Sequence, residues 1–235
     1  MANELRVMLE LGPKGKRVVA VAPDWPGLER GAKTGEAAIE RIQAYLPRYA
    51  PVAQLAGMGA QFAAIATDAA TDVAVVEQYP GTGSTDFWGI SFAFSRSDEQ
   101  ALSSEALERE LTLLQACWAF FDAVRARVSA ELRKGPRGGG RDRDRIVRHV
   151  LGTEQEWAAT KLGVRTLASE GALPTDTGLS AHRDAYRAAI RAFHAQGKPA
   201  RTWPLRYLIR HTAYHTLDHA WEMEDKDLAL TANRA

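Results

Sequence analysis

The stretch at residues 205–227 reads LRYLIRHTAYHTLDHAWEMEDKD, and it decides how the C-terminal half of the chain is interpreted. Its apolar residues recur at intervals of three and four, which predicts one amphipathic helix over Pro204–Lys226. Histidines recur every four residues along the same stretch, at His211, His215 and His219. Because imidazole rings four residues apart on a helix can converge on one ion, this spacing indicates a candidate metal site.

The positions of the three rings around the helix axis show which of them can face the interior of a bundle. Successive rings are rotated by about 40°, because each residue turns the helix by roughly 100°. On a helical wheel His219 lies within the apolar stripe, His215 lies on its edge, and His211 lies about 40° beyond that edge. A metal site inside a helical bundle needs ligands that point inward. The wheel therefore favours His215 and His219, with His211 as the alternate ligand.

A third ligand is needed, since catalytic zinc sites usually have three protein ligands and one open position. The best candidate is His149, near the start of a second helix that we expect over Asp142–Lys161. Glu154 falls in the apolar stripe of that helix, and a buried carboxylate must find a partner or a proton. We expect Glu154 either to orient a ligand histidine or to pair with an arginine, and Asp218 is a second candidate for the orienting role.

The rest of the C-terminal half also has helical periodicity. Further helices are predicted over Ser104–Lys134 and Ser180–Ala195, and four helices with short connections suggest a four-helix bundle. His182 and His194 lie in the polar third helix, so we expect both at the surface. The single cysteine, Cys117, rules out an internal disulfide and is flanked by bulky apolar residues, which favours an inert buried thiol.

The first hundred residues are interpreted as strands with one helix. The helix is expected to start at Thr34 and to stop before Pro47. The predicted strands are Leu5–Leu11, Arg17–Ala22, Asp72–Tyr79 and Phe87–Ser95. The fold class that follows is an α+β domain over residues 1–98, followed by an all-α four-helix bundle over residues 99–235.

Composition narrows the classes of function. The chain has 235 residues and a net charge of +1, so the whole molecule is not attracted to nucleic acid or to anionic lipid. Basic residues cluster over Arg133–Arg148, but aspartates interrupt them and no aromatic residue is present for base stacking, which favours a solvated loop over a nucleic-acid site. No apolar run reaches membrane-spanning length and the start lacks a signal-peptide pattern, so we expect a cytoplasmic protein without a membrane partner.

Two motifs of the C-terminal half carry a family resemblance. IVRHVLGTE at 146–154, together with RHTAYHTLDHAWEMED at 210–225, resembles the DinB/YfiT-like superfamily, and most of all its branch of mycothiol-dependent enzymes. The resemblance covers residues 103–226. It implies a four-helix bundle in which three histidines bind a divalent metal, zinc first with nickel or iron as alternatives, at a site open on one side.

Carried onto this chain, the resemblance implies that His149 and two histidines of the fourth helix are the ligands. The pattern typical of the superfamily corresponds to His211 and His215, whereas the branch with an HxxDHAWE-like string corresponds to His215 and His219. The implied activity is that of a metal-dependent transferase or isomerase, in which a low-molecular-weight thiol acts on a small molecule. The competing hypothesis is a non-catalytic binding or regulatory module.

A second, shorter resemblance concerns the N-terminal half. The segment VVAVAPDWPGLERGAKTGEAAIERIQAYL at 18–46 resembles the HicB-like antitoxin fold, and the match extends over residues 5–49. No DNA-binding helix-turn-helix or ribbon is appended to it, so we interpret this unit as a reused interaction scaffold. Its exposed strands are expected to be able to pair with a second copy, which makes a homodimer a candidate assembly.

Overall fold

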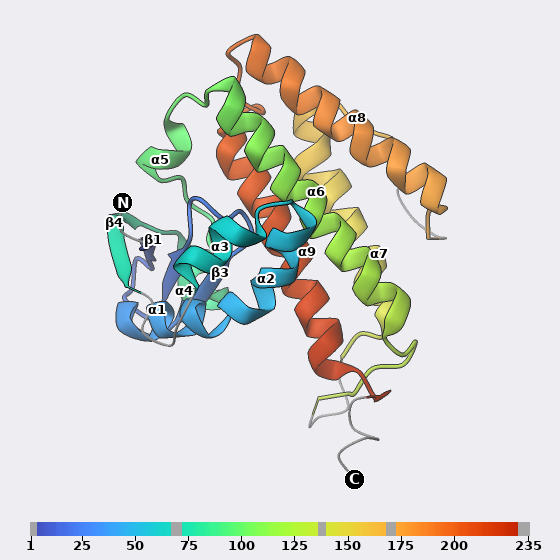
Figure 1. Cartoon of the computed structure of the whole chain (residues 1–235), viewed down its shortest axis with the longest axis horizontal. Coiled ribbons are helices and arrows are strands. Elements are labelled where there is room, and N and C mark those ends of the chain that lie inside the picture. Colours follow the sequence, from blue (N-terminus) through green and yellow to red (C-terminus); the bar gives the residue numbers. More distant parts are fainter. Residues whose placement is uncertain (1–3, 67–71, 136–139, 168–172, 230–235) are drawn as a thin grey trace.

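The computed structural model describes residues 4–66, 72–135, 140–167 and 173–229. It has an α+β layout, with one sheet in the N-terminal part and long helices in the C-terminal part (Figure 1). The sheet has four strands in the order β3-β2-β1-β4. Their bounds are β1 (Leu5–Leu11), β2 (Val18–Val21), β3 (Glu29–Ala32) and β4 (Val73–Pro80). Neighbouring strands are antiparallel except for the parallel pair β1 and β4, so the sheet is mixed.

Three helices follow the third strand, namely α1 (Gly35–Ala44), α2 (Leu46–Leu55) and α3 (Gly59–Ile65). Thr34 caps α1 as expected, because its hydroxyl accepts the N–H of Ala37. The predicted stop before Pro47 is also present, although a new helix starts there with the proline in its first turn. α1 packs against β2 and β3, α2 packs against α3 and α6 (Ser104–Arg127), and apolar residues of both helices join the main hydrophobic core.

The predicted strand over Phe87–Ser95 is wrong. Its first residues belong to a short helix, α4 (Gly83–Trp88), and the rest is irregular. The reason is a buried carboxylate on the neighbouring strand: Glu10 accepts the backbone N–H groups of Phe92 and Ala93, which a strand would have used in a ladder. Alternation of apolar residues carries no information about such a side chain, which is distant in the sequence.

The C-terminal part contains the four long helices and a short one, α5 (Arg96–Glu99), that precedes them. Their bounds are α6 (Ser104–Arg127), α7 (Arg143–Thr153), α8 (Asp176–Ala195) and α9 (Leu205–Lys226). In Figure 1, α6 runs along α9, and α7 and α8 lie on the side of α6 away from the sheet. The predicted second and fourth helices start within one residue of the observed starts.

Two helices end earlier than periodicity predicts. α6 stops at Arg127, because Asp227 accepts the N–H of Ser129 and draws the chain toward the end of α9. α7 gives way to a π-helical turn, η1 (Glu154–Ala158), followed by a short 3₁₀ segment, η2 (Ala159–Leu162). A π-turn inside a helix is uncommon, and it shifts the residues that follow to a new face.

One continuous hydrophobic core connects the two parts of the chain. It includes Val7 of β1, Val52 of α2, Leu114 of α6 and Leu217 of α9. Whether residues 98 and 99 mark a domain boundary stays a prediction. Arg137 of the basic stretch lies outside the described residues. Among the helices that the structure describes, none is both long and apolar enough to cross a bilayer.

Candidate metal centre

Three histidines meet where α7 passes α9. His149 comes from α7, and His215 and His219 come from consecutive turns of α9. The ring centroids are 5.1 Å apart for His149 and His215, 4.9 Å for His149 and His219, and 4.7 Å for His215 and His219. Each ring offers one nitrogen, and the three nitrogens all lie within 4.8 Å of one another. The structure thus brings together the two histidines that the helical wheel favoured and His149, the candidate third ligand.

The surroundings keep the rings of His149 and His215 neutral. Burial, together with the neighbouring rings of His219 and His149, lowers the pKa of His215 to about 2. Burial likewise lowers the pKa of His149 to about 4, again with a contribution from His219. A neutral imidazole has the free nitrogen lone pair that a metal ion needs. All three residues are only partly buried, so each keeps some surface exposed to solvent.

Glu222 forms a hydrogen bond with the ring of His219. Its Oε2 atom lies 2.6 Å from Nδ1 of His219, one helical turn earlier, which leaves Nε2 of His219 free to face the other two histidines. Histidines that ligate metals commonly donate their second ring N–H to a carboxylate in this way. Glu222 was not among the residues selected from the sequence. The i,i+3 spacing from His219 was the available signal for its role.

His211 is not part of the cluster. Its ring stacks against Tyr207 and meets Phe92 and Trp203 edge to face, with centroids at 5.3, 4.9 and 5.5 Å. Burial lowers its pKa to about 3, and its Nδ1 atom has no hydrogen-bond partner among the described residues. The alternate set of ligands, which used His211 with His215, therefore does not meet around one point in this structure.

Glu154 is buried as expected, but it orients a different histidine. Its two oxygens accept from Nε2 of His182 at 2.9 Å and from the indole N–H of Trp118 at 2.7 Å. Because the carboxylate accepts at Nε2, that nitrogen carries the proton, and Nδ1 lies 2.6 Å from the hydroxyl of Thr166. The prediction that His182 lies at the surface is wrong: its exposed fraction is 0%. Glu154 comes five residues after His149, so it lies about 140° from it around the helix axis and bonds to His182 and Trp118 instead.

Asp218, the second candidate for an orienting carboxylate, also has another partner. Its Oδ1 atom accepts from Nη1 of Arg30 at 3.2 Å. The guanidinium of Arg30 lies over the rings of Tyr45 and Trp221, at 3.6 and 4.4 Å from their centroids. Asp218 therefore links β3 to α9, rather than orienting a ligand histidine.

The remaining histidine and the cysteine lie outside the cluster. Cys117 is fully buried, as predicted, and burial raises the pKa of its thiol far above the ordinary value, which fits an inert group. His194 is half-buried, and its Nε2 donates to the backbone carbonyl of Leu102 at 2.8 Å.

No family model, curated protein or solved structure matches the chain. The resemblances to the DinB/YfiT-like superfamily and to the HicB-like fold therefore stay predictions. A metal centre is supported by the geometry of the three histidines and by the carboxylate of Glu222 beside His219.

Proposed function

We propose that α6, α7, α8 and α9 form a DinB-like four-helix bundle in which His149, His215 and His219 hold a divalent metal ion. Zinc is the first choice and nickel or iron are alternatives, because all of them accept three imidazole ligands. The observation that carries this proposal is the approach of three ring nitrogens, from two helices, to within 4.8 Å of one another.

The activity that fits such a centre is a thiol-dependent transfer or isomerisation on a small molecule. A divalent ion at this position lowers the pKa of a low-molecular-weight thiol and so provides a nucleophilic sulfur at neutral pH. The chain's own contribution is to keep His149 and His215 neutral through burial and to fix the ring of His219 through Glu222. The choice of a mycothiol-type thiol derives from the family resemblance, and Cys117 has no part in the scheme.

The first test is the metal content of the protein, purified without chelators or metal-affinity resin and measured by elemental analysis. We expect near-equimolar metal in the native chain and its loss after substitution of any one of the three clustered histidines by alanine. His211→Ala is the control on the same helix and is expected to keep the metal. Circular dichroism establishes that each variant is folded. Metal well below equimolar amounts, or metal that persists in His215→Ala, would contradict the proposal.

A graded test uses the carboxylate behind the site. Glu222→Gln is expected to weaken metal affinity by about 10- to 100-fold, the range typical of groups that orient ligand histidines. Asp218→Asn, one residue before His219, is expected to leave metal affinity unchanged because Asp218 bonds to Arg30. Competition with a fluorescent chelator measures both variants. Equal effects of the two substitutions would show that Glu222 does not act through His219.

The enzymatic part is tested separately, with a panel of low-molecular-weight thiols and a small electrophile. We expect conjugation or isomerisation that depends on added metal and disappears in His149→Ala. A chain that binds metal tightly but shows no thiol-dependent turnover would limit the proposal to metal binding.

A second candidate function, a non-catalytic interaction module, is favoured by apolar side chains exposed in the N-terminal part. β4 is an edge strand, and its Val75 and Val76 are 41% and 42% exposed, while Phe87 and Trp88 nearby in the chain are 69% and 66% exposed. Such edges are templates for pairing with a second copy. If β4 pairs with a second copy of the chain, Val76→Lys is expected to convert the dimer to a monomer in analytical ultracentrifugation without altering the metal content. A native chain that is monomeric at high concentration would exclude this assembly.

A further inference from the structure

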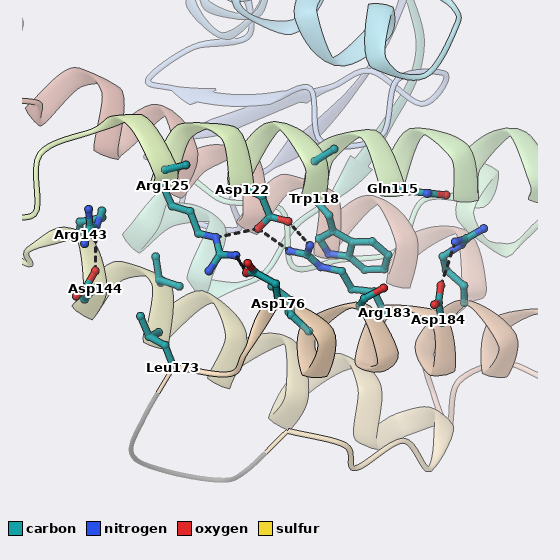
Figure 2. A pocket seen from close by; sticks show the side chains of 16 residues that line it. Gln115, Trp118, Asp122, Arg125, Arg143, Asp144, Leu173, Asp176, Arg183 and Asp184 are labelled. Atoms are coloured by element: carbon teal, nitrogen blue, oxygen red, sulfur yellow. Dashed lines mark hydrogen bonds and ion pairs between the residues drawn. The ribbon is translucent and has the colours of Figure 1, made fainter.

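A cleft of about 720 Å³ lies between α6, α7 and α8 (Figure 2). This volume is within the range of small-molecule sites in proteins, roughly 300–1,000 Å³. The cleft is separate from the histidine cluster. Val147 of α7 lines it, whereas His149, two residues later, is rotated by about 200° and faces α9.

Arginines form the inner part of this cleft. Arg125, Arg143, Arg183 and Arg187 line it, and their side chains are only 20%, 28%, 13% and 22% exposed. Arginine presents several donors in a rigid planar group that matches carboxylate and phosphate oxygens. The long helices on either side hold the four guanidinium groups in place.

Most of the carboxylates that pair with these arginines lie at the solvent side; the exception is Asp122 of α6, which is 31% exposed and pairs with Arg125 and Arg183. Asp176 and Asp184 are 92% and 69% exposed, and Asp144 is 45% exposed. Pairs with such solvated carboxylates contribute little, because water and salt compete for both partners. Asp176 accepts a hydrogen bond from Nη2 of Arg125 at 2.8 Å. An anion that enters the cleft can therefore replace these aspartates at low cost.

The arginines also retain unused donors. The Nε atoms of Arg183 and Arg187 are buried and have no acceptor within the parts of the chain that the structure describes. The ion pair between Arg187 and Asp184 is long, at 3.5 Å. A buried donor without an acceptor costs free energy, so a ligand oxygen that can supply an acceptor is favoured.

An apolar wall accompanies the charges. Trp118, Val147 and Leu179 line the cleft and are each 2% exposed. The indole of Trp118 is held from behind by Glu154, which in turn bonds to His182, so this wall is rigid. The guanidinium of Arg183 lies 5.3 Å from the centroid of the Trp118 ring, so a flat apolar group can pack at the edge of this wall while an anionic group reaches the arginines.

We propose that this cleft binds a small organic anion, with a carboxylate or phosphate group held by the arginines and a flat apolar body against Trp118. The proposal does not depend on the metal centre. The competing explanation is that the ion pairs serve only to attach α8 to α6, as the bond between Arg183 and Asp122 does.

The test uses 8-anilinonaphthalene-1-sulfonate, a flat aromatic anion, titrated into the full chain and followed by its fluorescence. The double substitution Arg143→Gln and Arg187→Gln is expected to weaken binding about tenfold or more, since both guanidinium groups are lost. Asp176→Asn is expected to tighten binding about two- to fivefold, because it removes a competing carboxylate. Displacement by benzoate or by phenyl phosphate then shows which headgroup the arginines prefer.

Two controls accompany these variants. Arg191→Gln removes an arginine of α8 that pairs with Glu108 outside the cleft, and it is expected to leave binding unchanged. His149→Ala is also expected to leave it unchanged, which separates this test from that of the metal centre. Binding that is equal in the native chain and the double arginine variant, or that fails to tighten in Asp176→Asn, overturns the proposal.

Discussion

At the scale of single residues, Arg210 shows how buried charges connect the two parts of the chain. Its guanidinium forms two bonds with Asp98, at 2.7 and 2.8 Å, and one with Glu29 of β3, at 3.0 Å. Burial opposes ionisation of Asp98, but Arg210 outweighs it and the pKa of Asp98 is lowered. Burial instead raises the pKa of Glu29 to about 7, in spite of Arg210. Asp98 is thus the counter-ion of Arg210.

The raised pKa of Glu29 predicts that the stability of the folded protein depends on pH. The folded pKa of Glu29, about 7, lies above the unfolded value of 4.5, so the folded state holds the proton more tightly. The resulting stabilisation is complete below pH 4.5 and is lost as the pH rises through 7. Glu29→Gln mimics the protonated form, so we expect this variant to lose much less stability than the native chain between pH 5 and 8. Urea unfolding at several pH values measures the effect, of order 1 kcal/mol for each unit of pKa difference.

Glu110→Gln is a useful comparison for that experiment. Burial raises the pKa of Glu110 to about 7 as well, with Arg206 as its opposing partner. Ionisation of Glu110 is therefore also expected to reduce the stability of the folded state as the pH rises, and Glu110→Gln is expected to remove that part of the pH dependence. An identical pH profile for the native chain and Glu29→Gln would mean that Glu29 is ionised in the folded state at neutral pH.

At the scale of elements, the turn between β2 and β3 is packed directly on α9. Gly27 has a φ of 93°, a conformation that side chains disfavour. A Cβ atom at this position would lie 2.8 Å from Cδ1 of Leu217 and 3.1 Å from the backbone of Ala213. The Pro-Asp-x-Pro-Gly turn is therefore required for docking the sheet onto the helix that carries His215 and His219.

Gly27→Ala is expected to destabilise the protein by about 2–4 kcal/mol, from the positive φ and the close approach together. Gly57→Ala is the matched control. Gly57 also has a positive φ, 71°, but a Cβ there would meet nothing within 4 Å, so only the conformational cost of about 1–2 kcal/mol applies. Urea unfolding midpoints compare the two variants. Equal losses would show that the contact with α9 adds nothing.

At the scale of the whole molecule, the sheet and the long helices share one core and several polar links. α2 packs on α6, and Arg48 of α2 bonds to Glu224 and Asp225 at the end of α9. Unfolding of the sheet alone would remove Glu29 of β3 and leave Arg210 with one buried donor that has lost its acceptor.

We therefore expect the sheet and the helices to unfold in one cooperative transition, although chains of this length often have intermediates. Hydrogen exchange followed by mass spectrometry, over a range of urea concentrations, measures this by segment. Peptides from β1 and from α9 are expected to become exposed with the same free energy. Exposure of β1 at clearly lower urea than α9 would show that the two parts unfold independently.

The predictions that succeeded from sequence rest on short-range patterns. Apolar spacing placed the start of the last helix, and the rotation of about 40° between residues four apart selected His215 and His219 over His211. The strand over residues 72–79 and the capped helix at Thr34 were found in the same way. These features depend on residues that are close together along the chain, so they can be predicted from the sequence alone.

Tertiary structure decided what depends on groups far apart in the chain. Glu10 took the backbone N–H groups that would have made residues 87–95 a strand. Packing of α8 against the second helix placed His182 on the carboxylate of Glu154, which made an expected surface histidine a buried one. The approach of His149 to His215 and His219 likewise requires α7 to pass α9 at one particular place. Periodicity states which face of a helix is apolar, but the partner of that face is set by packing of the whole chain.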